Sequence, residues 1–194
     1  GNILVIDDDL QITENDEKNY HEMITHVPLN YIKNAKSVLI IGGGDGGVLT
    51  EVLKHKNLEH IYNVEIDETV INTSKRFFPH IGYSFDNNRV NLVIKDASKW
   101  VKEQVEKKKH FFDVIIIDST DYGSSETLFT DEFESNIKHI LKKDGIFVFN
   151  YSSLGWYCDD GCKNNIQDFI TKYREKFNHV YLYQVYQPTY HSGH

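Results

Sequence analysis

Apolar and polar residues follow two alternating patterns along the chain. Short runs of consecutive apolar residues are typical of strands buried on both faces, and segments with apolar residues three or four positions apart are typical of amphipathic helices. The chain opens with two short strand patterns, at 3–7 and 10–13, and a helix pattern at 17–32. Further strands are expected at 36–41, 60–66, 89–96, 111–118, 146–151 and 179–186, and helices at 48–55, 68–78, 99–110, 132–145 and 164–177.

The alternation of strand and helix predicts an α/β fold of the Rossmann-like, doubly wound kind, with a mostly parallel sheet covered by helices on both faces. The first two strands, joined by a turn, are expected to be the remnant of an N-terminal β-hairpin region over residues 1–15. Residues 16–194 are expected to form the Rossmann-like catalytic domain. Ligands of such sheets bind at the carboxyl ends of the strands, so the residues there are the first candidates for a site.

A glycine-rich loop joins the strand at 36–41 to the helix at 48–55. Gly42, Gly44 and Gly47 match G-x-G-x-x-G, and Asp45 lies inside the loop. A carboxylate beside this helix N-terminus would repel the pyrophosphate of a dinucleotide. A ligand with a cationic end fits the loop instead, and S-adenosyl sulfonium compounds are candidates. The loop therefore argues against NAD.

Acidic residues also end the next two strands. Glu65 lies twenty positions after Asp45, where a carboxylate can accept hydrogen bonds from both hydroxyls of an adenosine ribose. Asp96, followed by the small Ala97, can accept a hydrogen bond from an adenine amino group. Asp96 can equally cap the helix that follows, and the two interpretations are compatible.

Two carboxylates three residues apart, Asp118 and Asp121, follow the apolar strand at 111–118. Such a pair can bind an ammonium, and one member can remove a proton from an amine as the amine becomes nucleophilic. The alternative is that Asp118 caps a turn through Ser119 and Thr120. The residues alone leave both interpretations open.

Charge narrows the class of ligand. The 194-residue chain has a formal net charge of −8, which speaks against nucleic-acid binding because phosphate contacts need a basic face. The same sign suits a cationic substrate through long-range attraction.

Composition indicates a reduced, cytoplasmic protein. No apolar run approaches the ~20 residues of a membrane span, and no signal-peptide pattern opens the chain. Cys158 and Cys162 are the only cysteines, and their spacing fits neither a disulfide framework nor a metal site. No membrane partner and no metal are expected.

Seven segments, in one order along nearly the whole chain, resemble the polyamine aminopropyltransferases and most closely the spermidine synthases. They are LQITENDEKNYHEMITHVPL, VLIIGGGDGGVLTEV, VEIDETVI, KDASKW, DVIIIDSTD, ETLF and PTYHSG. GGGDGG with YHEM upstream and D-S-x-D downstream is more specific than a generic methyltransferase pattern. The resemblance implies the class I S-adenosylmethionine-methyltransferase-like variant of the Rossmann-like fold, a homodimer, and closing family strands absent from this chain.

The resemblance also implies a reaction. An aminopropyl group would move from decarboxylated S-adenosylmethionine, a co-substrate rather than a prosthetic group, to putrescine, giving spermidine and 5′-methylthioadenosine. By resemblance, Gln11, His21 and Asp45 line the aminopropyl end, Glu65 holds the ribose, Asp96 and Ala97 meet adenine, Asp118 accepts the proton, and Tyr20, Asp121 and Tyr190 position the diamine.

Two departures from the family pattern keep alternatives open. Tyr122 and Ser125 replace two prolines that usually follow the second aspartate, and SSLGW lacks the usual Glu or Gln before its tryptophan. One alternative is a related enzyme that uses another amine acceptor or methylates with S-adenosylmethionine. Another is a catalytically weak regulatory or binding relative. The joint presence of Tyr20, Asp45 and Asp118 with the other acids argues against the last.

Overall fold

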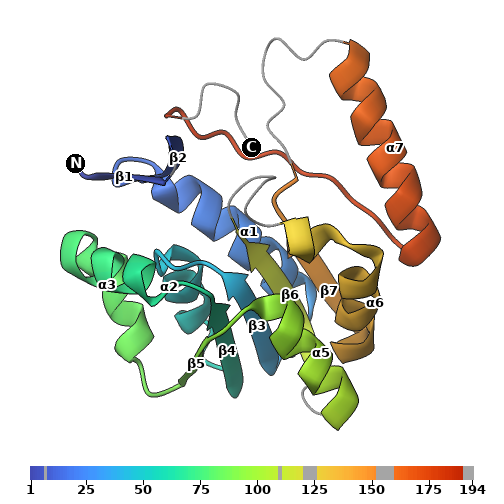
Figure 1. Cartoon of the computed structure of the whole chain (residues 1–194), viewed down its shortest axis with the longest axis horizontal. Coiled ribbons are helices and arrows are strands. Elements are labelled where there is room, and N and C mark those ends of the chain that lie inside the picture. The colour runs from blue at the N-terminus through green and yellow to red at the C-terminus, as the bar shows by residue number, and fades with distance from the viewer. Residues whose placement is uncertain (7, 109–110, 120–125, 152–159, 190–194) are drawn as a thin grey trace. The chain divides into compact units, whose positions relative to one another are not determined.

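Five parallel strands form the central sheet, in the order β5–β4–β3–β6–β7 (Figure 1). The computed structural model describes residues 1–6, 8–108, 111–119, 126–151 and 160–189. It divides into two units, Gly1–Asn150 and Tyr151–His194, and the sheet belongs to the first. The strands are β3 (Ser37–Gly42), β4 (His60–Glu65), β5 (Val90–Ile94), β6 (Phe112–Asp118) and β7 (Leu141–Phe149).

The strand order places the topological switch between β3 and β6. The chain moves outward from β3 through β4 to β5 and then returns to the other side of β3. Loops at such a point diverge above the sheet and leave room for a ligand. The predicted α/β, mostly parallel, Rossmann-like fold is therefore confirmed, and the switch point marks where to look for the site.

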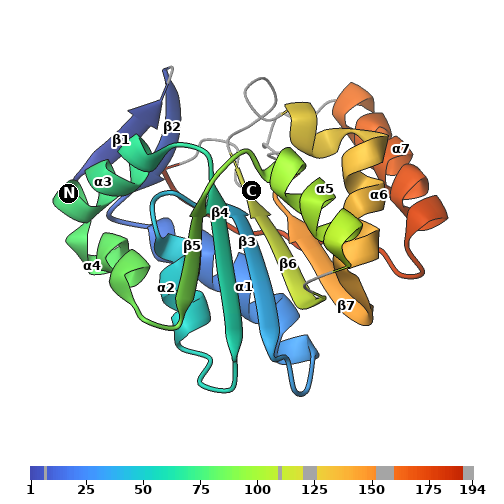
Figure 2. The same cartoon turned by 60° about the horizontal axis from the view of Figure 1, so that its bottom comes forward.

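Helices cover both faces of the sheet because its central strands are apolar on both sides. On β3, Val38 and Ile40 pack into one core with α1 and α2, while Leu39 and Ile41 pack into the other with α5 and α6. Figure 2 shows the latter pair in front of the sheet and the former behind it. The helices are α1 (Glu17–Tyr31), α2 (Gly47–Leu53), α3 (Glu68–Phe77), α4 (Pro79–Gly82), α5 (Ala97–Lys107) and α6 (Asp131–Ile140), with short 3-10 turns at Tyr83–Asp86 and Glu126–Phe129.

The predicted N-terminal hairpin is also confirmed. β1 (Ile3–Ile6) and β2 (Asp9–Thr13) pair antiparallel. The domain boundary expected after residue 15 stays a prediction. No helix among the described residues is long and apolar enough to cross a membrane.

The second unit contains α7 (Asp160–Lys176). The rings of Phe169, Tyr173 and Phe177, four residues apart, stack with centroid distances of 4.4 and 6.1 Å. The strand expected at 179–186 is wrong, because this segment pairs with no strand among the described residues. A segment rich in residues with high strand propensity does not form a strand by itself, because a neighbouring strand must pair with its backbone N–H and C=O groups.

The helix expected at 132–145 is also wrong at its end. α6 stops at Ile140, and β7 begins at Leu141, which takes an extended conformation and pairs with Phe112 on β6. Gly145, the last residue of the expected helix, lies inside the strand instead. Pairing with β6 here outweighs the helix propensity of the lysines at 142 and 143.

The carboxylate of Asp113 on β6 connects the N-terminal ends of β3, β6 and β7 through hydrogen bonds. Its Oδ2 accepts hydrogen bonds from the backbone N–H groups of Lys36 and Ser37 at 2.8 and 2.9 Å. The Ser37 hydroxyl and the Lys142 ammonium also donate to it, each at 2.8 Å. Burial alone would raise the pKa of Asp113, but Lys142 and the backbone donors outweigh it and hold the pKa below 3.8.

We expect Asp113→Asn to lower the free energy of unfolding at pH 7 by about 2 kcal/mol, because hydrogen bonds to a charged acceptor are the stronger ones. Urea denaturation measures this, with the exposed Asp144→Asn on β7 as the matched control. A folded pKa below the unfolded ~3.9 means that the carboxylate stabilises above that value and loses its effect as the pH falls through the folded pKa. Equal urea midpoints for Asp113→Asn and the unmutated protein at pH 7 would contradict this role of Asp113.

Candidate active site

The carboxyl ends of β3 and β6 are held together by their backbones. Gly42 pairs in register with Asp118, and the Gly43 N–H donates to the Asp118 carbonyl at 2.7 Å. The buried Asn63 amide donates to the Gly42 carbonyl at 2.7 Å. Gly42 itself has φ +80°, a conformation that other residues rarely adopt. The glycine loop therefore leaves the sheet on a fixed path, directly beside Asp118.

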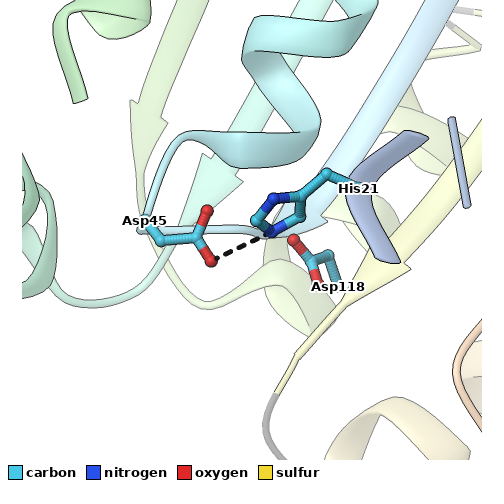
Figure 3. Close-up of side chains that lie close together, drawn as sticks. All are labelled: His21, Asp45 and Asp118. Atoms are coloured by element: carbon cyan, nitrogen blue, oxygen red, sulfur yellow. Dashed lines mark ion pairs between the residues drawn. The ribbon is translucent and has the colours of Figure 1, made fainter. Parts of the chain in front are cut away.

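His21, Asp45 and Asp118 converge at this point from α1, the glycine loop and β6 (Figure 3). One side-chain nitrogen or oxygen from each lies within 4.8 Å of the others, and His21 Nε2 is 3.6 Å from Asp45 Oδ2. The imidazole ring of His21, on α1, reaches the glycine loop only because Gly47 has no side chain. A Cβ at Gly47 would lie 2.0 Å from His21 Cε1. Asp45 is oriented by the Gly47 N–H, which donates to its Oδ1 at 2.5 Å.

The His21 ring is cationic at neutral pH. Burial alone would lower its pKa, but the charge and hydrogen bond of Asp45 and the hydrogen bond with Glu17 outweigh burial and raise the pKa from 6.5 to about 10. The same pair lowers the pKa of Asp45, against the effect of burial. A nitrogen and two oxygens at this spacing can in general attract a divalent cation, but here the imidazolium already occupies the position between the carboxylates.

Asp118 is poised to exchange a proton near neutral pH. Burial and the charge of Asp45 raise its pKa to about 7, although His21 and a hydrogen bond from Tyr20 act in the other direction. The Tyr20 hydroxyl donates to Asp118 Oδ1 at 2.9 Å, whereas Oδ2 is buried without a hydrogen-bond partner among the described residues. The alternative cap through Thr120 is not tested, because Thr120 lies outside those residues.

Glu65 lies on the other side of the loop, at the end of β4. Its Oε1 accepts the backbone N–H groups of Ile66 and Asp67 at 2.8 and 3.0 Å. A Cβ at Gly44 would lie 3.0 Å from Oε2 and 2.9 Å from Val70 Cγ1, so a side chain there would require Glu65 or Val70 to shift. Burial raises the pKa of Glu65, against the two backbone hydrogen bonds. One oxygen is thus fixed by the backbone, and the other faces the loop.

Asp96 caps helix α5, as one of its two interpretations predicted. Its Oδ1 accepts the backbone N–H and the hydroxyl of Ser98 at 2.9 and 2.7 Å, and these bonds lower its pKa. Ala97 is the buried first residue of α5. Their contact with adenine stays a prediction. Gln11 lies on β2, and its role also stays a prediction. Asp121 and Tyr190 lie outside the described residues.

Comparison with known proteins decides the family. Residues 17–194 match the spermine/spermidine synthase domain. The chain belongs to that family.

Relatives within the spermine/spermidine synthase family are longer than this chain. A polyamine aminopropyltransferase of Thermoanaerobacter sp. (strain X514) is 50% identical over 76% of the chain and 52% of its own length. One of Ruegeria sp. (strain TM1040) is 43% identical over 100% of the chain and 66% of its own length. The chain thus spans about half to two thirds of the curated relatives it matches.

Solved structures of spermidine synthases share the fold. One, crystallised in complex with the transition-state analogue AdoDATO, superposes with a TM-score of 0.85 at 37% identity, over 98% of this chain and 63% of that one. The enzyme from Thermotoga maritima gives 0.81 at 36% identity, over 98% and 61%. This likeness confirms the class I methyltransferase-like variant of the fold.

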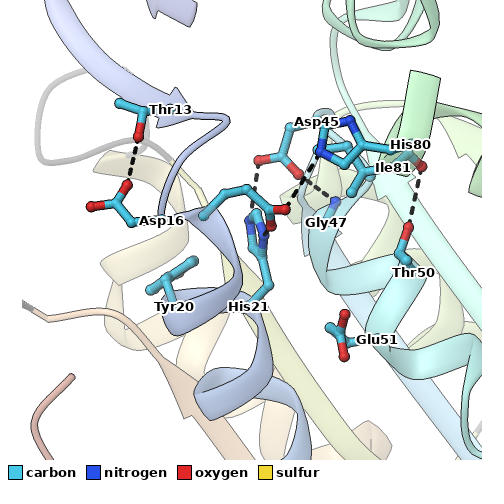
Figure 4. Close-up of polar contacts among 12 residues, drawn as sticks. Thr13, Asp16, Tyr20, His21, Asp45, Gly47, Thr50, Glu51, His80 and Ile81 are labelled. Atoms are coloured by element: carbon cyan, nitrogen blue, oxygen red, sulfur yellow. Dashed lines mark hydrogen bonds and ion pairs between the residues drawn. The ribbon is translucent and has the colours of Figure 1, made fainter. Parts of the chain in front are cut away.

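Two members of the site were missed in the sequence. Glu17, only 2% exposed, places Oε2 2.6 Å from His21 Nδ1, and its Oε1 lies 3.5 Å from Nε2 of His80. Figure 4 shows His21 and His80 on their separate helices near Asp45. The four-residue spacing of Glu17 and His21 on a predicted helix was an available signal, because such residues face each other. His80 follows Pro79 in the unpredicted helix α4, and no local pattern points to it.

Proposed function

We propose that this protein transfers the aminopropyl group of decarboxylated S-adenosylmethionine to putrescine, giving spermidine and 5′-methylthioadenosine. The observation that carries the proposal is the set of carboxylates around His21 at the switch point, with Asp118 poised to exchange a proton. Membership of the spermine/spermidine synthase family supports it. By the same resemblance we propose that it acts as a homodimer.

The chemistry requires one base. The attacking amine must first lose a proton, which Asp118 can accept on Oδ2, an oxygen without a hydrogen-bond partner in the part of the chain that the structure describes. The neutral nitrogen then attacks the methylene carbon beside the sulfonium, so a C–N bond forms as the C–S bond breaks. The sulfur keeps the bonding electrons and leaves as the neutral thioether of 5′-methylthioadenosine. Tyr20, which donates to Asp118 Oδ1, holds the carboxylate in place for this step.

The adenosine end would lie along the loop. We propose that Glu65, at the end of β4 and beside Gly44, accepts hydrogen bonds from the ribose hydroxyls. We propose that Asp96 and Ala97, which follow the neighbouring strand β5, contact the adenine ring. Asp121 and Tyr190 are proposed to position the diamine with Tyr20. That a solved relative is a spermidine synthase in complex with a transition-state analogue supports the proposed reaction.

We expect Glu65→Gln to raise the dissociation constant of 5′-methylthioadenosine about tenfold or more. A neutral amide has a single acceptor oxygen, and a charge-assisted hydrogen bond contributes roughly 1.5–3 kcal/mol. Calorimetry measures the affinity, and Glu68→Gln, an exposed neighbour at the start of α3, is the matched control. Unchanged affinity in Glu65→Gln would mean that the ribose is held elsewhere.

Production of 5′-methylthioadenosine tests the function itself. Its release, followed by chromatography, should require both decarboxylated S-adenosylmethionine and a diamine. Release with no diamine present would indicate simple hydrolysis of the donor. The absence of release when decarboxylated S-adenosylmethionine and a diamine are both present would contradict the proposal.

A further inference from the structure

The site already contains a cation where the proposed ligand would bring its own. His21 lies between Asp118 and Asp45, and Asp45 is one of the residues expected to line the aminopropyl end of the ligand. The side chain is 4% exposed, and the ring is protonated at neutral pH. Two cations side by side in a buried pocket would repel each other strongly. Either the ligand binds against this repulsion or the ring gives up its charge.

Glu17 determines which nitrogen of the ring can change. Its Oε2 lies 2.6 Å from Nδ1, and both side chains are buried within α1. A carboxylate at this distance keeps the proton on Nδ1 and fixes the ring orientation. The other nitrogen, Nε2, is the one that faces Asp45. Deprotonation at Nε2 would leave an acceptor aimed at the carboxylate pair.

We propose that binding of the cationic adenosyl ligand displaces the proton from His21 Nε2, so that the ligand's ammonium replaces the imidazolium between Asp45 and Asp118. One proton leaves for solvent as one ammonium enters, so the number of cations beside Asp45 and Asp118 is unchanged, and the ligand's sulfonium adds one positive charge to the site as a whole. The neutral Nε2 then accepts a hydrogen bond from the ammonium, while Nδ1 still donates to Glu17. The inference rests on the proposed function, because it needs a ligand with an ammonium at this end.

The surroundings of His21 are consistent with this exchange. The titratable groups that face the ring are Glu17 and Tyr20 from α1, Asp45 from the loop and Asp118 from β6. The other oxygen of Glu17, Oε1, lies 3.5 Å from Nε2 of His80. The His80 side chain is 38% exposed, and its Nδ1 lies 3.9 Å from Oε1 of Glu14. A line of alternating carboxylate and imidazole groups thus leads from the Nδ1 side of the buried ring to the surface and keeps the proton on Nδ1, whereas the displaced proton leaves from Nε2, on the side of Asp45.

A pH window separates His21 from the other groups. Between pH 8 and 9 Asp118, with a pKa of about 7, is already ionised, whereas His21, with a pKa of about 10, is still charged. An alkylammonium with a pKa near ~10.4 also remains charged there. A proton released on binding in this window therefore comes from His21.

The test is calorimetric titration of the protein with decarboxylated S-adenosylmethionine at pH 8 and pH 9, in two buffers with different ionisation enthalpies. We expect about one proton released per ligand, and a dissociation constant about tenfold lower at pH 9 than at pH 8 by linkage. 5′-Methylthioadenosine, which lacks the ammonium, should release none, and its affinity should not depend on pH.

Variants give the matched comparison. His21→Gln should bind decarboxylated S-adenosylmethionine with no proton release and no pH dependence, while 5′-methylthioadenosine affinity is kept. Glu17→Gln should lower the proton count at pH 9, because the ring loses a group that holds its charge. Binding of decarboxylated S-adenosylmethionine by the unmutated protein without proton release would overturn the exchange and leave the proposed function standing. Failure of that ligand to bind, when 5′-methylthioadenosine does, would overturn both.

Discussion

Asp118→Asn is expected to lower turnover on the order of a hundredfold or more, while the fold and the affinity for 5′-methylthioadenosine remain nearly unchanged. An amide cannot take the proton that the attacking amine must lose, and loss of a general base has an effect of this size. The substitution keeps the shape of the side chain and an acceptor for the Tyr20 hydroxyl. Steady-state kinetics with decarboxylated S-adenosylmethionine and putrescine measure it.

The pH profile identifies the base. Since burial and Asp45 raise the pKa of Asp118 to about 7, the carboxylate form is lost as the pH falls through that value, and the rate of the unmutated protein should break downward there. The residual rate of Asp118→Asn should lack that break. Asp144→Asn, remote on β7, is the control and should keep full turnover. Turnover of Asp118→Asn within a few-fold of the parent would remove Asp118 from the role.

Asp45→Asn is expected to weaken binding of decarboxylated S-adenosylmethionine and to narrow its advantage over S-adenosylmethionine. The carboxylate of the latter would enter a pocket where Glu17, Asp45 and Asp118 outnumber the single imidazolium of His21. A bare ion pair at about 4 Å contributes ~4 kcal/mol at an intermediate dielectric, and after desolvation a net preference of ~1–3 kcal/mol is expected.

Competition binding of the two compounds measures this preference in the unmutated protein and in Asp45→Asn. Asp86→Asn, an exposed acid in a surface pair with Lys75, is the control and should leave the preference unchanged. If the unmutated protein binds both compounds equally, Asp45 does not select the decarboxylated form.

The sequence was sufficient for the sheet and its helices because their signals are local. Strands β3 and β6 are buried on both faces, and the sequence shows such burial directly as a run of consecutive apolar residues. The end of α6 could not be predicted, because pairing of Leu141 with Phe112 depends on a strand nearly thirty positions away. For the same reason, the segment at 179–186 has strand composition without strand pairing.

The part of the site at the carboxyl ends of the strands was predictable, because the parallel sheet brings these strand ends together. Asp45, Glu65 and Asp118 follow strands whose carboxyl ends meet, so their proximity follows from the topology. The charge of His21 and the pKa of Asp118 could not be predicted, because both result from burial and from contacts between α1, the loop and β6. His80 joins the site only through the tertiary position of α4.

The most direct test of the account is the identity of the product. The purified protein is incubated with decarboxylated S-adenosylmethionine carrying a heavy-isotope aminopropyl group and with putrescine, cadaverine and spermidine in competition, and the amines are identified by mass. We expect labelled spermidine, formed in equal amount with 5′-methylthioadenosine and in larger amount than the products of cadaverine and spermidine. The absence of any aminopropylated amine, or a methylated amine when S-adenosylmethionine replaces the decarboxylated donor in a parallel incubation, would contradict the proposed function.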